Sequence, residues 1–196
     1  MDPNSEAQQA ADEHQIQSLI YKYCRALDRC DGDLLKSIYW PDAIHNHTVF
    51  NGNAYDFADY AIPAMKKYFL KTLHCISNIL IEFRGDVATS ECYCTAYHRI
   101  SNDAQIVKEV FGDDYFRKVE KTNADSHDFI YLGRYVDRFE RRQGAWRIAS
   151  RLVVQEWTIN QPSTAIWAQS LANSVKASGS RDLEDPSYVL SASRAM

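Results

Sequence analysis

The sequence predicts an α+β domain in which a mostly antiparallel, curved sheet folds over N-terminal helices. Apolar residues recur at helical spacing in the first part of the chain, and further on the period changes to the alternation of strands. Helices first and a meander of long strands afterwards are typical of this class. The length of 196 residues suits one domain with a buried core.

Three helices are expected before the main sheet. Residues 5–28 form the first, because apolar side chains there make one stripe at helical spacing. The pair Asp31-Gly32 predicts a turn, and a short second helix follows that Pro41 ends. Residues 55–70 form the third helix, which is also amphipathic.

Strands are expected before and after the third helix. The first is closed by a hairpin turn at Asn51-Gly52, and the last two are joined by a tight turn at Gln143-Gly144. The expected strands span residues 44–50, 78–84, 88–100, 129–142 and 145–157.

Two segments fall outside this pattern. Residues 101–127 form a long insertion, partly helical over residues 106–119, of a length often found in lids or oligomer contacts. We therefore expect a domain over residues 1–160 that contains this insertion, followed by a C-terminal extension over residues 161–196.

The extension has too little apolar content to fold alone. We expect it to dock, on this chain or on a neighbouring subunit, through Trp167 and Tyr188. The charged residues Arg181 and Asp182, with Asp185 before Pro186, could hold it in place by ion pairs.

Composition excludes several classes of protein. A net charge of −4 provides no basic footprint for nucleic acid. No window approaches 18 consecutive apolar residues, so no membrane span is expected, and the polar N-terminus lacks the apolar core of a secretory signal. Five cysteines without paired spacing indicate reduced thiols, so we expect a cytoplasmic protein.

Polar residues at positions where the pattern favours apolar ones suggest chemistry. Asp28 ends the first helix, His74 opens a buried strand, and Arg151 lies inside the last strand. If they converge, Asp28 could fix the tautomer of His74, whose other nitrogen would remove a carbon-bound proton. Arg151 could then steady a departing anion, and Tyr23 could donate to a leaving hydroxyl. Each also has an ordinary structural interpretation, and spacing alone cannot prove the convergence.

Three motifs resemble the SnoaL-like branch of the nuclear transport factor 2-like superfamily. They are the run IQSLIYKYCRALDRCDGDLLKSIYWPDA, then LHCISNILIEF, then GRYVDRFERRQGAWRIASR. The resemblance covers roughly residues 10–158, and it is strongest to the scytalone dehydratase, bile acid 7α-dehydratase and hexachlorocyclohexane dehydrochlorinase members.

The resemblance implies a cone-shaped barrel with a deep apolar pocket. By position, Asp28 and His74 match the family's catalytic dyad, Arg151 matches its pocket arginine, and Tyr23 matches a tyrosine near the leaving group. The implied pocket-lining residues are Met65, Phe69, Thr72, Tyr131 and Tyr135.

On the central strand, the register decides which side chains face the pocket. The resemblance favours Tyr97 together with Tyr93 and Thr95, whereas a slip of one residue would bring His98 inward instead.

The resemblance also implies a lyase that needs no cofactor and acts on a hydrophobic aromatic or polycyclic substrate, by loss of water, hydrogen chloride or formaldehyde. A homo-oligomer, most often a trimer, is expected, with neither nucleic acid nor membrane as partner. Open alternatives are a ketosteroid-type isomerase, a non-catalytic ligand-binding protein and the small subunit of a ring-hydroxylating dioxygenase. His45 and His47 share a strand face, but without a nearby acid at ligand spacing we expect no metal.

Overall fold

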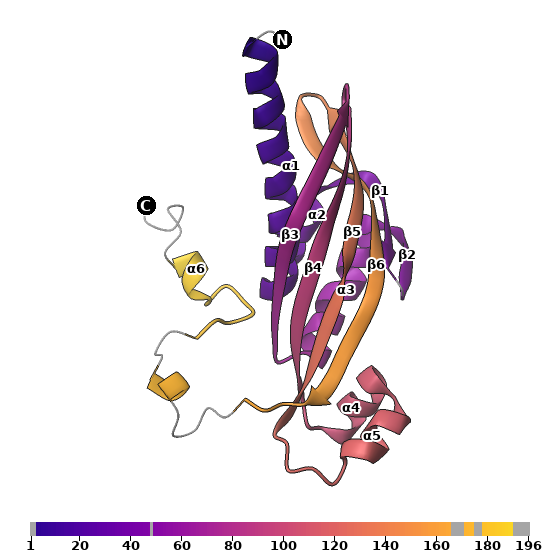
Figure 1. Cartoon of the computed structure of the whole chain (residues 1–196), viewed down its shortest axis with the longest axis vertical. Helices are drawn as coiled ribbons and strands as arrows, with labels where there is room; N and C mark the ends of the chain where they lie inside the picture. Colours follow the sequence, from indigo (N-terminus) through magenta and orange to yellow (C-terminus); the bar gives the residue numbers. More distant parts are fainter. Residues whose placement is uncertain (1–2, 48, 166–170, 175–177, 190–196) are drawn as a thin grey trace.

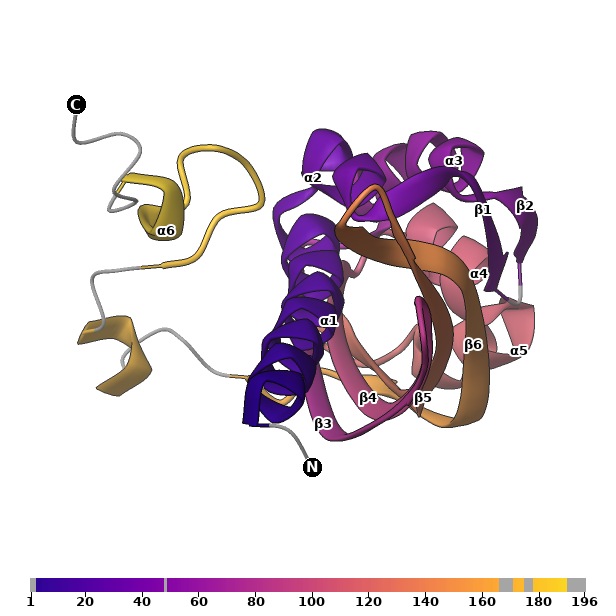
Figure 2. The ribbon, with the colours of Figure 1, turned by 90° about the horizontal axis from the view of Figure 1, so that it is seen from above.

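A long N-terminal helix, α1 (Pro3–Arg29), and two shorter helices cover the concave side of a curved sheet (Figures 1 and 2). The computed structural model describes residues 3–47, 49–165, 171–174 and 178–189. The shorter helices are α2 (Gly32–Ser37) and α3 (Ala54–Tyr68). This is the predicted α+β class, with the helices where their apolar periodicity placed them.

Six strands form one sheet in the order β2-β1-β6-β5-β4-β3. Neighbouring strands are antiparallel except β1 and β6, which are parallel. The strands are β1 (Tyr39–His47), β2 (Phe50–Asn53), β3 (Lys71–Arg84), β4 (Val87–Ser101), β5 (Ser126–Arg142) and β6 (Ala145–Pro162). Figure 2 shows how β3 to β6 curve around the space beneath the helices, so the core lies inside this curve.

The apolar stripe of α1 packs into that core. Ile16, Ile20 and Tyr23 are almost fully buried, as the helical spacing predicted. The helix ends in a Schellman arrangement: Cys30 adopts a positive φ of 51°, and the Asp31 amide bonds the Ala26 carbonyl at 2.9 Å. Asp31 then caps α2 by accepting from the Leu34 amide. This sharp ending places Asp28 in the last turn of α1.

Local turn signals were partly wrong around the first strand. Pro41 lies inside β1, and α2 ends at Ser37, before the predicted stop. Asn51 and Gly52 lie within β2 and pair with β1, because His47 pairs with Phe50 and the connection lies between these two residues. The Gln143-Gly144 turn is confirmed, with φ values of 53° and 80° that suit a tight hairpin.

Strand β3 is longer than predicted and is bent. It starts at Lys71, so His74 lies within the strand and not at its mouth. Asn78 has a φ of 51° where the pairing with β4 shifts between Ser77 and Leu80. A bulge of this kind bends a strand and increases its twist.

The insertion contains two short helices, α4 (Ala104–Phe111) and α5 (Asp113–Val119), separated at Gly112. Beyond β6, the described residues include a short 3-10 helix over Leu171–Ser174 and α6 (Pro186–Val189). Trp167 lies outside the described residues. Within the described part of the chain, none of the helices combines the length and the apolar character needed to span a membrane.

Candidate active site

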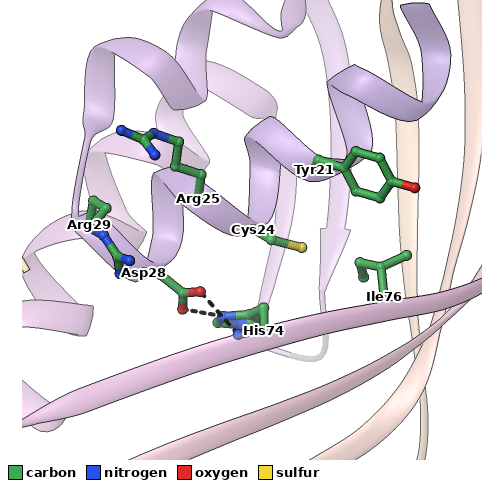
Figure 3. Close-up of a pocket in the computed structure, with 7 residues that line it drawn as sticks. All are labelled: Tyr21, Cys24, Arg25, Asp28, Arg29, His74 and Ile76. Atoms are coloured by element: carbon green, nitrogen blue, oxygen red, sulfur yellow. Dashed lines mark hydrogen bonds and ion pairs between the residues drawn. The ribbon is translucent and has the colours of Figure 1, made fainter. Parts of the chain in front are cut away.

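Asp28 and His74 meet between α1 and the start of β3 (Figure 3). The Asp28 Oδ1 lies 2.7 Å from His74 Nδ1, and Oδ2 accepts the backbone N–H of His74 at 3.0 Å. Because β3 is an edge strand, this amide is available to Asp28. The hydroxyl of Thr72 donates to Oδ1 at 2.9 Å. Three donors therefore fix the carboxylate, and Nε2 of His74 makes no hydrogen bond within the described residues.

The Asp28 carboxylate is held in its charged form. Burial acts to raise its pKa, but the hydrogen bonds and charge of His74, with the Thr72 hydroxyl, outweigh burial and lower the pKa overall. An ionised carboxylate on Nδ1 keeps the proton on that nitrogen and leaves Nε2 as the basic one. The pair thus has the arrangement of a general base with its orienting acid.

His74 lines an apolar cavity of about 300 Å³ beneath the helices. Its walls come from α1, α3 and the inner faces of β1, β3, β4, β5 and β6. They consist of Tyr23, Leu27, His47, Val49, Phe57, Tyr60, Ala61, Ala64, Met65, Tyr68, Phe69, His74, Ala96, His98, Phe129, Tyr131, Tyr135 and Val153. Among them, Tyr23, Met65, Phe69, Tyr131 and Tyr135 were predicted from the sequence.

A second hollow, of about 330 Å³, reaches the same pair from the outer flank of α1. Figure 3 shows Asp28 and Cys24 extending from α1 toward β3, with His74 and Ile76 on the strand below. Tyr21, Arg25 and Arg29 complete its lining. The dyad therefore separates the inner cavity from an open, more polar hollow.

The prediction that Tyr97 faces the cavity was wrong. On β4 every second residue is buried, among them Cys92, Cys94, Ala96 and His98, and the tyrosines between these four face outward. The Tyr97 hydroxyl donates to Asp128 at 2.7 Å on the other side of the sheet. The covered face of β4 contains the small side chains of Cys92, Cys94 and Ala96, which leave room for the cavity beneath the helices.

His98 takes the place expected for Tyr97. Its ring stacks on Phe129 at 5.1 Å and meets the His74 ring edge-on at 5.3 Å. Burial, supported by the nearby charge of His74, lowers the pKa of His98 to about 3. At neutral pH the cavity therefore contains a neutral imidazole beside the dyad.

Arg151 does not reach the cavity wall. Its side chain is fully buried and forms a two-pronged ion pair with Asp137, with N–O distances of 2.7 and 2.6 Å. The guanidinium carbon lies 4.0 Å from the Tyr23 ring centroid and 4.3 Å from that of Tyr135. The prediction of direct contact with a departing anion is thus corrected: Arg151 supports two tyrosines that themselves line the cavity.

Thr72 also has a different place from the one predicted. It is buried, but its hydroxyl is bound to Asp28, and it is not part of the cavity wall. Tyr131 does line the cavity, and its hydroxyl donates to the Val154 carbonyl at 2.7 Å. Gly133 makes this possible, because a Cβ there would lie 2.2 Å from both the Tyr131 hydroxyl and the Val154 carbonyl oxygen.

The two histidines of β1 lie close together, with ring centroids 6.2 Å apart, but they have different roles in the fold. His45 is buried, its Nδ1 lies 3.0 Å from the Tyr39 hydroxyl, and its ring stacks on Phe57. Burial lowers the pKa of His45 to about 2. His47 lines the cavity. Among the described residues, no group of three or more His, Cys, Asp or Glu side chains could hold a metal ion.

Comparison with known proteins agrees with this geometry. The sequence matches the SnoaL-like domain over residues 8–152, which is most of the chain. The chain belongs to the SnoaL-like domain family. This family shares the nuclear transport factor 2-like fold, so the resemblance inferred from the three motifs is confirmed. No curated protein matches the chain significantly.

Solved structures share the fold at low sequence identity. A hexachlorocyclohexane dehydrochlorinase, LinA type 2, has a TM-score of 0.65 and 17% identity over 82% of this chain and 96% of its own. A candidate scytalone dehydratase from Novosphingobium aromaticivorans has a TM-score of 0.62 and 18% identity over 82% and 93%. A protein of unknown function from Mycobacterium tuberculosis has a TM-score of 0.58 and 21% identity over 88% and 86%.

Proposed function

We propose that the protein is a cofactor-independent lyase that uses the Asp28–His74 pair to remove a proton from carbon. The observation that carries this proposal is a hydrogen-bonded histidine–carboxylate pair on the wall of an apolar cavity. His74 Nε2 would take the proton, the C–H electrons would form the new double bond, and the leaving group would depart with its bonding electrons. Asp28 would stabilise the imidazolium that forms.

Tyr23 is the proposed donor to the leaving group. Its ring lines the cavity, and burial raises the pKa of its hydroxyl, which keeps it protonated. The Arg151–Asp137 pair packs against this ring and so fixes its position. A hydroxide that departs would take its proton from Tyr23 and leave as water. Chloride would need only the hydrogen bond. Loss of formaldehyde would be a retro-aldol cleavage, in which His74 Nε2 takes the proton of a hydroxyl instead of one on carbon. The O–H electrons then form the C=O bond of the aldehyde, and the electrons of the broken C–C bond stay on the remaining fragment, where a conjugated carbonyl of the substrate accepts them.

The walls of the cavity suggest a flat, apolar substrate. Aromatic side chains approach from α3, β4 and β5, including Phe57, Phe69, Phe129 and Tyr131. Aromatic rings favour stacked or edge-on contacts with other rings. A volume of about 300 Å³ lies at the lower end of the range for small-molecule sites. Hydroxylated or halogenated aromatic compounds therefore fit better than large polycycles, and LinA type 2 is named as a dehydrochlorinase of a chlorinated ring.

We infer that the protein forms a homo-oligomer, with a trimer favoured, and that the outer face of the sheet contributes to the contact. Leu80 is 68% exposed and Trp157 58% exposed on this face, and Leu73, Tyr93 and Ile159 are exposed near them. A hollow of about 490 Å³ lies between β4, β5 and β6 on this side. Large exposed apolar patches mark interaction sites. Light scattering should give a mass about three times that of the chain, and Trp157→Glu should lower it; a monomeric wild type would contradict this.

A substrate panel analysed by mass spectrometry tests the proposed reaction. The purified protein, without added cofactor, is incubated with lignin-derived aryl diols, hydroxylated steroids and small chlorinated rings. We expect one product lighter by water, hydrogen chloride or formaldehyde, and no such product with His74→Ala. A product of unchanged mass but altered double-bond position would favour the isomerase alternative. A compound retained through desalting without any change would favour a ligand-binding protein.

A further inference from the structure

The C-terminal segment over residues 178–188, here called the clamp, contacts every element that positions the dyad. It lies beyond the SnoaL-like domain match, which ends at residue 152. Figures 1 and 2 show α6 and the stretch before it on the α1 side of the molecule, away from α4 and α5. Its contacts extend from the end of α1 to the start of β3.

On one side, the clamp binds residues on both sides of Asp28 in the sequence. Arg29 pairs with Asp185 at 3.2 Å, and the Tyr188 hydroxyl donates to the Asp31 carboxylate at 2.9 Å. The guanidinium of Arg25, one turn before Arg29, lies 4.5 Å from the centre of the Tyr188 ring. These contacts fix the last turn of α1, where Asp28 lies.

On the other side, the clamp binds the residues that precede His74. Nη1 of Arg181 donates to the Met65 carbonyl at 2.8 Å and to the Phe69 carbonyl. A cation suits these carbonyls at the C-terminal end of α3. Lys71, the first residue of β3, reaches back to the hydroxyl of Ser178 at 3.3 Å. The clamp therefore spans both elements across which the Asp28–His74 hydrogen bond is made.

The clamp has internal structure that keeps these contacts in register. Asp185 is only 2% exposed, and its carboxylate accepts the amides of Ser180 at 2.9 Å and Ser187 at 3.0 Å. A buried carboxylate that accepts backbone amides closes a turn much as an Asx motif does. Arg181 lies within this closed turn, so the backbone of the turn orients its side chain toward the end of α3.

Arg181 also brings charge close to the dyad. Its Nε and Nη2 atoms are buried and have no hydrogen-bond partner among the described residues. Burial lowers the pKa of Arg181, and the nearby Cys30 and Asp28 oppose this effect. His98 is faced by His74 from β3, Asp28 from α1, the Phe129 carbonyl from β5 and Arg181 from the clamp, whose charge helps to keep this imidazole neutral.

We propose that the clamp is part of the active-site structure and that Arg181 is a positioning residue for the Asp28–His74 pair. Arg181 connects the end of α3 to the clamp, and the clamp in turn contacts the end of α1. These contacts keep Asp28 within hydrogen-bond distance of His74. The inference rests on the proposed function only in that the pair is catalytic; the structural role of Arg181 can be measured without any substrate.

Amide hydrogen exchange of the full chain tests this proposal, because the His74 amide donates to Asp28 and reports its position. We expect Arg181→Gln to accelerate exchange of this amide about tenfold, since a charge-assisted contact is lost. Arg181→Lys should restore most of the protection. Tyr188→Phe, which removes the hydroxyl that donates to Asp31, should give a smaller change in the same direction. Arg117→Gln is the matched control, because it removes the same charge from an exposed site on α5.

Several outcomes would overturn the role of Arg181. Unchanged exchange at His74 in Arg181→Gln would do so, and so would equal acceleration around Phe139 in β5, which would indicate general destabilisation. If exchange at His74 alone accelerates but no substrate is turned over by the wild type, the clamp stands and the proposed lyase function fails. With an active substrate, Arg181→Gln should lower kcat more than it changes KM.

Discussion

Two buried acid–base pairs lie in the described part of the chain, and they differ in what surrounds them. Asp28 and His74 lie between a cavity and an outer hollow, and Nε2 of the histidine remains available. Asp137 and Arg151 have side chains that are 0% exposed, and the guanidinium packs against the rings of Tyr23 and Tyr135. Both pairs are close and well oriented, yet only the first can reach a ligand.

This difference predicts a chemical role for the Asp28–His74 pair and a structural role for the Asp137–Arg151 pair. A histidine with one nitrogen oriented by a carboxylate can gain and lose a proton at the other. An arginine whose guanidinium makes two hydrogen bonds to Asp137 cannot exchange a proton in this way. Burial acts to lower the pKa of Arg151, but the charge of Asp137 outweighs burial and holds this pKa well above the usual value. Breaking the first pair should therefore remove function, whereas breaking the second should remove stability.

The largest expected effect is on turnover. His74→Ala should lower kcat/KM by about 10²- to 10⁴-fold, the usual contribution of a general base, and Asp28→Asn should cause a smaller loss. The fold should persist in His74→Ala, because the Thr72 hydroxyl and the backbone amide of residue 74 still donate to the Asp28 carboxylate. Steady-state kinetics on the substrate found in the panel, with thermal unfolding of the same samples, measures both. His14→Ala, at an exposed position of α1, is the control; retained turnover in His74→Ala would contradict the mechanism.

A second effect concerns stability and applies to the Arg151 pair. Arg151→Met leaves the Asp137 carboxylate buried without its partner and should lower the free energy of unfolding by about 3–5 kcal/mol. The double variant Arg151→Met/Asp137→Leu should be more stable than either single variant, because no unpaired charge remains. Denaturant unfolding measures this. Arg117→Ala, which breaks an exposed pair, should cost under about 1 kcal/mol. Equal effects of Arg151→Met and Arg117→Ala would show that burial does not distinguish these pairs.

The smallest expected effect is on how steeply the free energy of unfolding changes with pH. The folded protein holds His98 neutral with its pKa lowered to about 3, whereas the unfolded chain protonates it near its ordinary value of about 6.5. The unfolded state thus binds more protons between these values, so stability falls as pH decreases through this window. His98→Gln should reduce the slope of unfolding free energy against pH by up to about 1.4 kcal/mol per pH unit.

Asp28 contributes to stability over a different pH range from His98. Its folded pKa is lowered, so its contribution is present above the unfolded pKa and is lost only as pH falls through the lower folded value. Urea unfolding at several pH values above about 4, the ordinary pKa of Asp, therefore isolates the histidine effect. An unchanged slope in His98→Gln would mean that this ring is not held neutral by the fold.

Much of the fold followed from local pattern. The stripe of α1, the tight turn at Gln143-Gly144 and the alternation of the later strands are properties of short stretches, and the structure confirms them. The residues Asp28 and His74 were also identified from the sequence, because a polar group on an apolar helix or strand stands out. That they meet at 2.7 Å could not be derived from spacing, since they are 46 positions apart.

The partner of Arg151 could not be found from the hairpin alone. An uninterrupted hairpin from Gln143-Gly144 would place Val136 opposite Arg151. A bulge between Arg138 and Phe139 shifts the register by one residue and places Asp137 there instead. The local sequence therefore gives no partner for Arg151, because its pairing with Asp137 depends on this bulge.

The sequence by itself determined the three N-terminal helices, the later strands and the choice of Asp28 and His74 as candidate residues, because these depend on periodicity and on residue type. Only the tertiary structure decided which face of β4 is covered, since a period of two is the same for both faces and helix packing selects one. It also decided that Arg181 reaches the end of α3, more than 100 residues away along the chain. Such contacts arise from chain topology, and no local pattern encodes them.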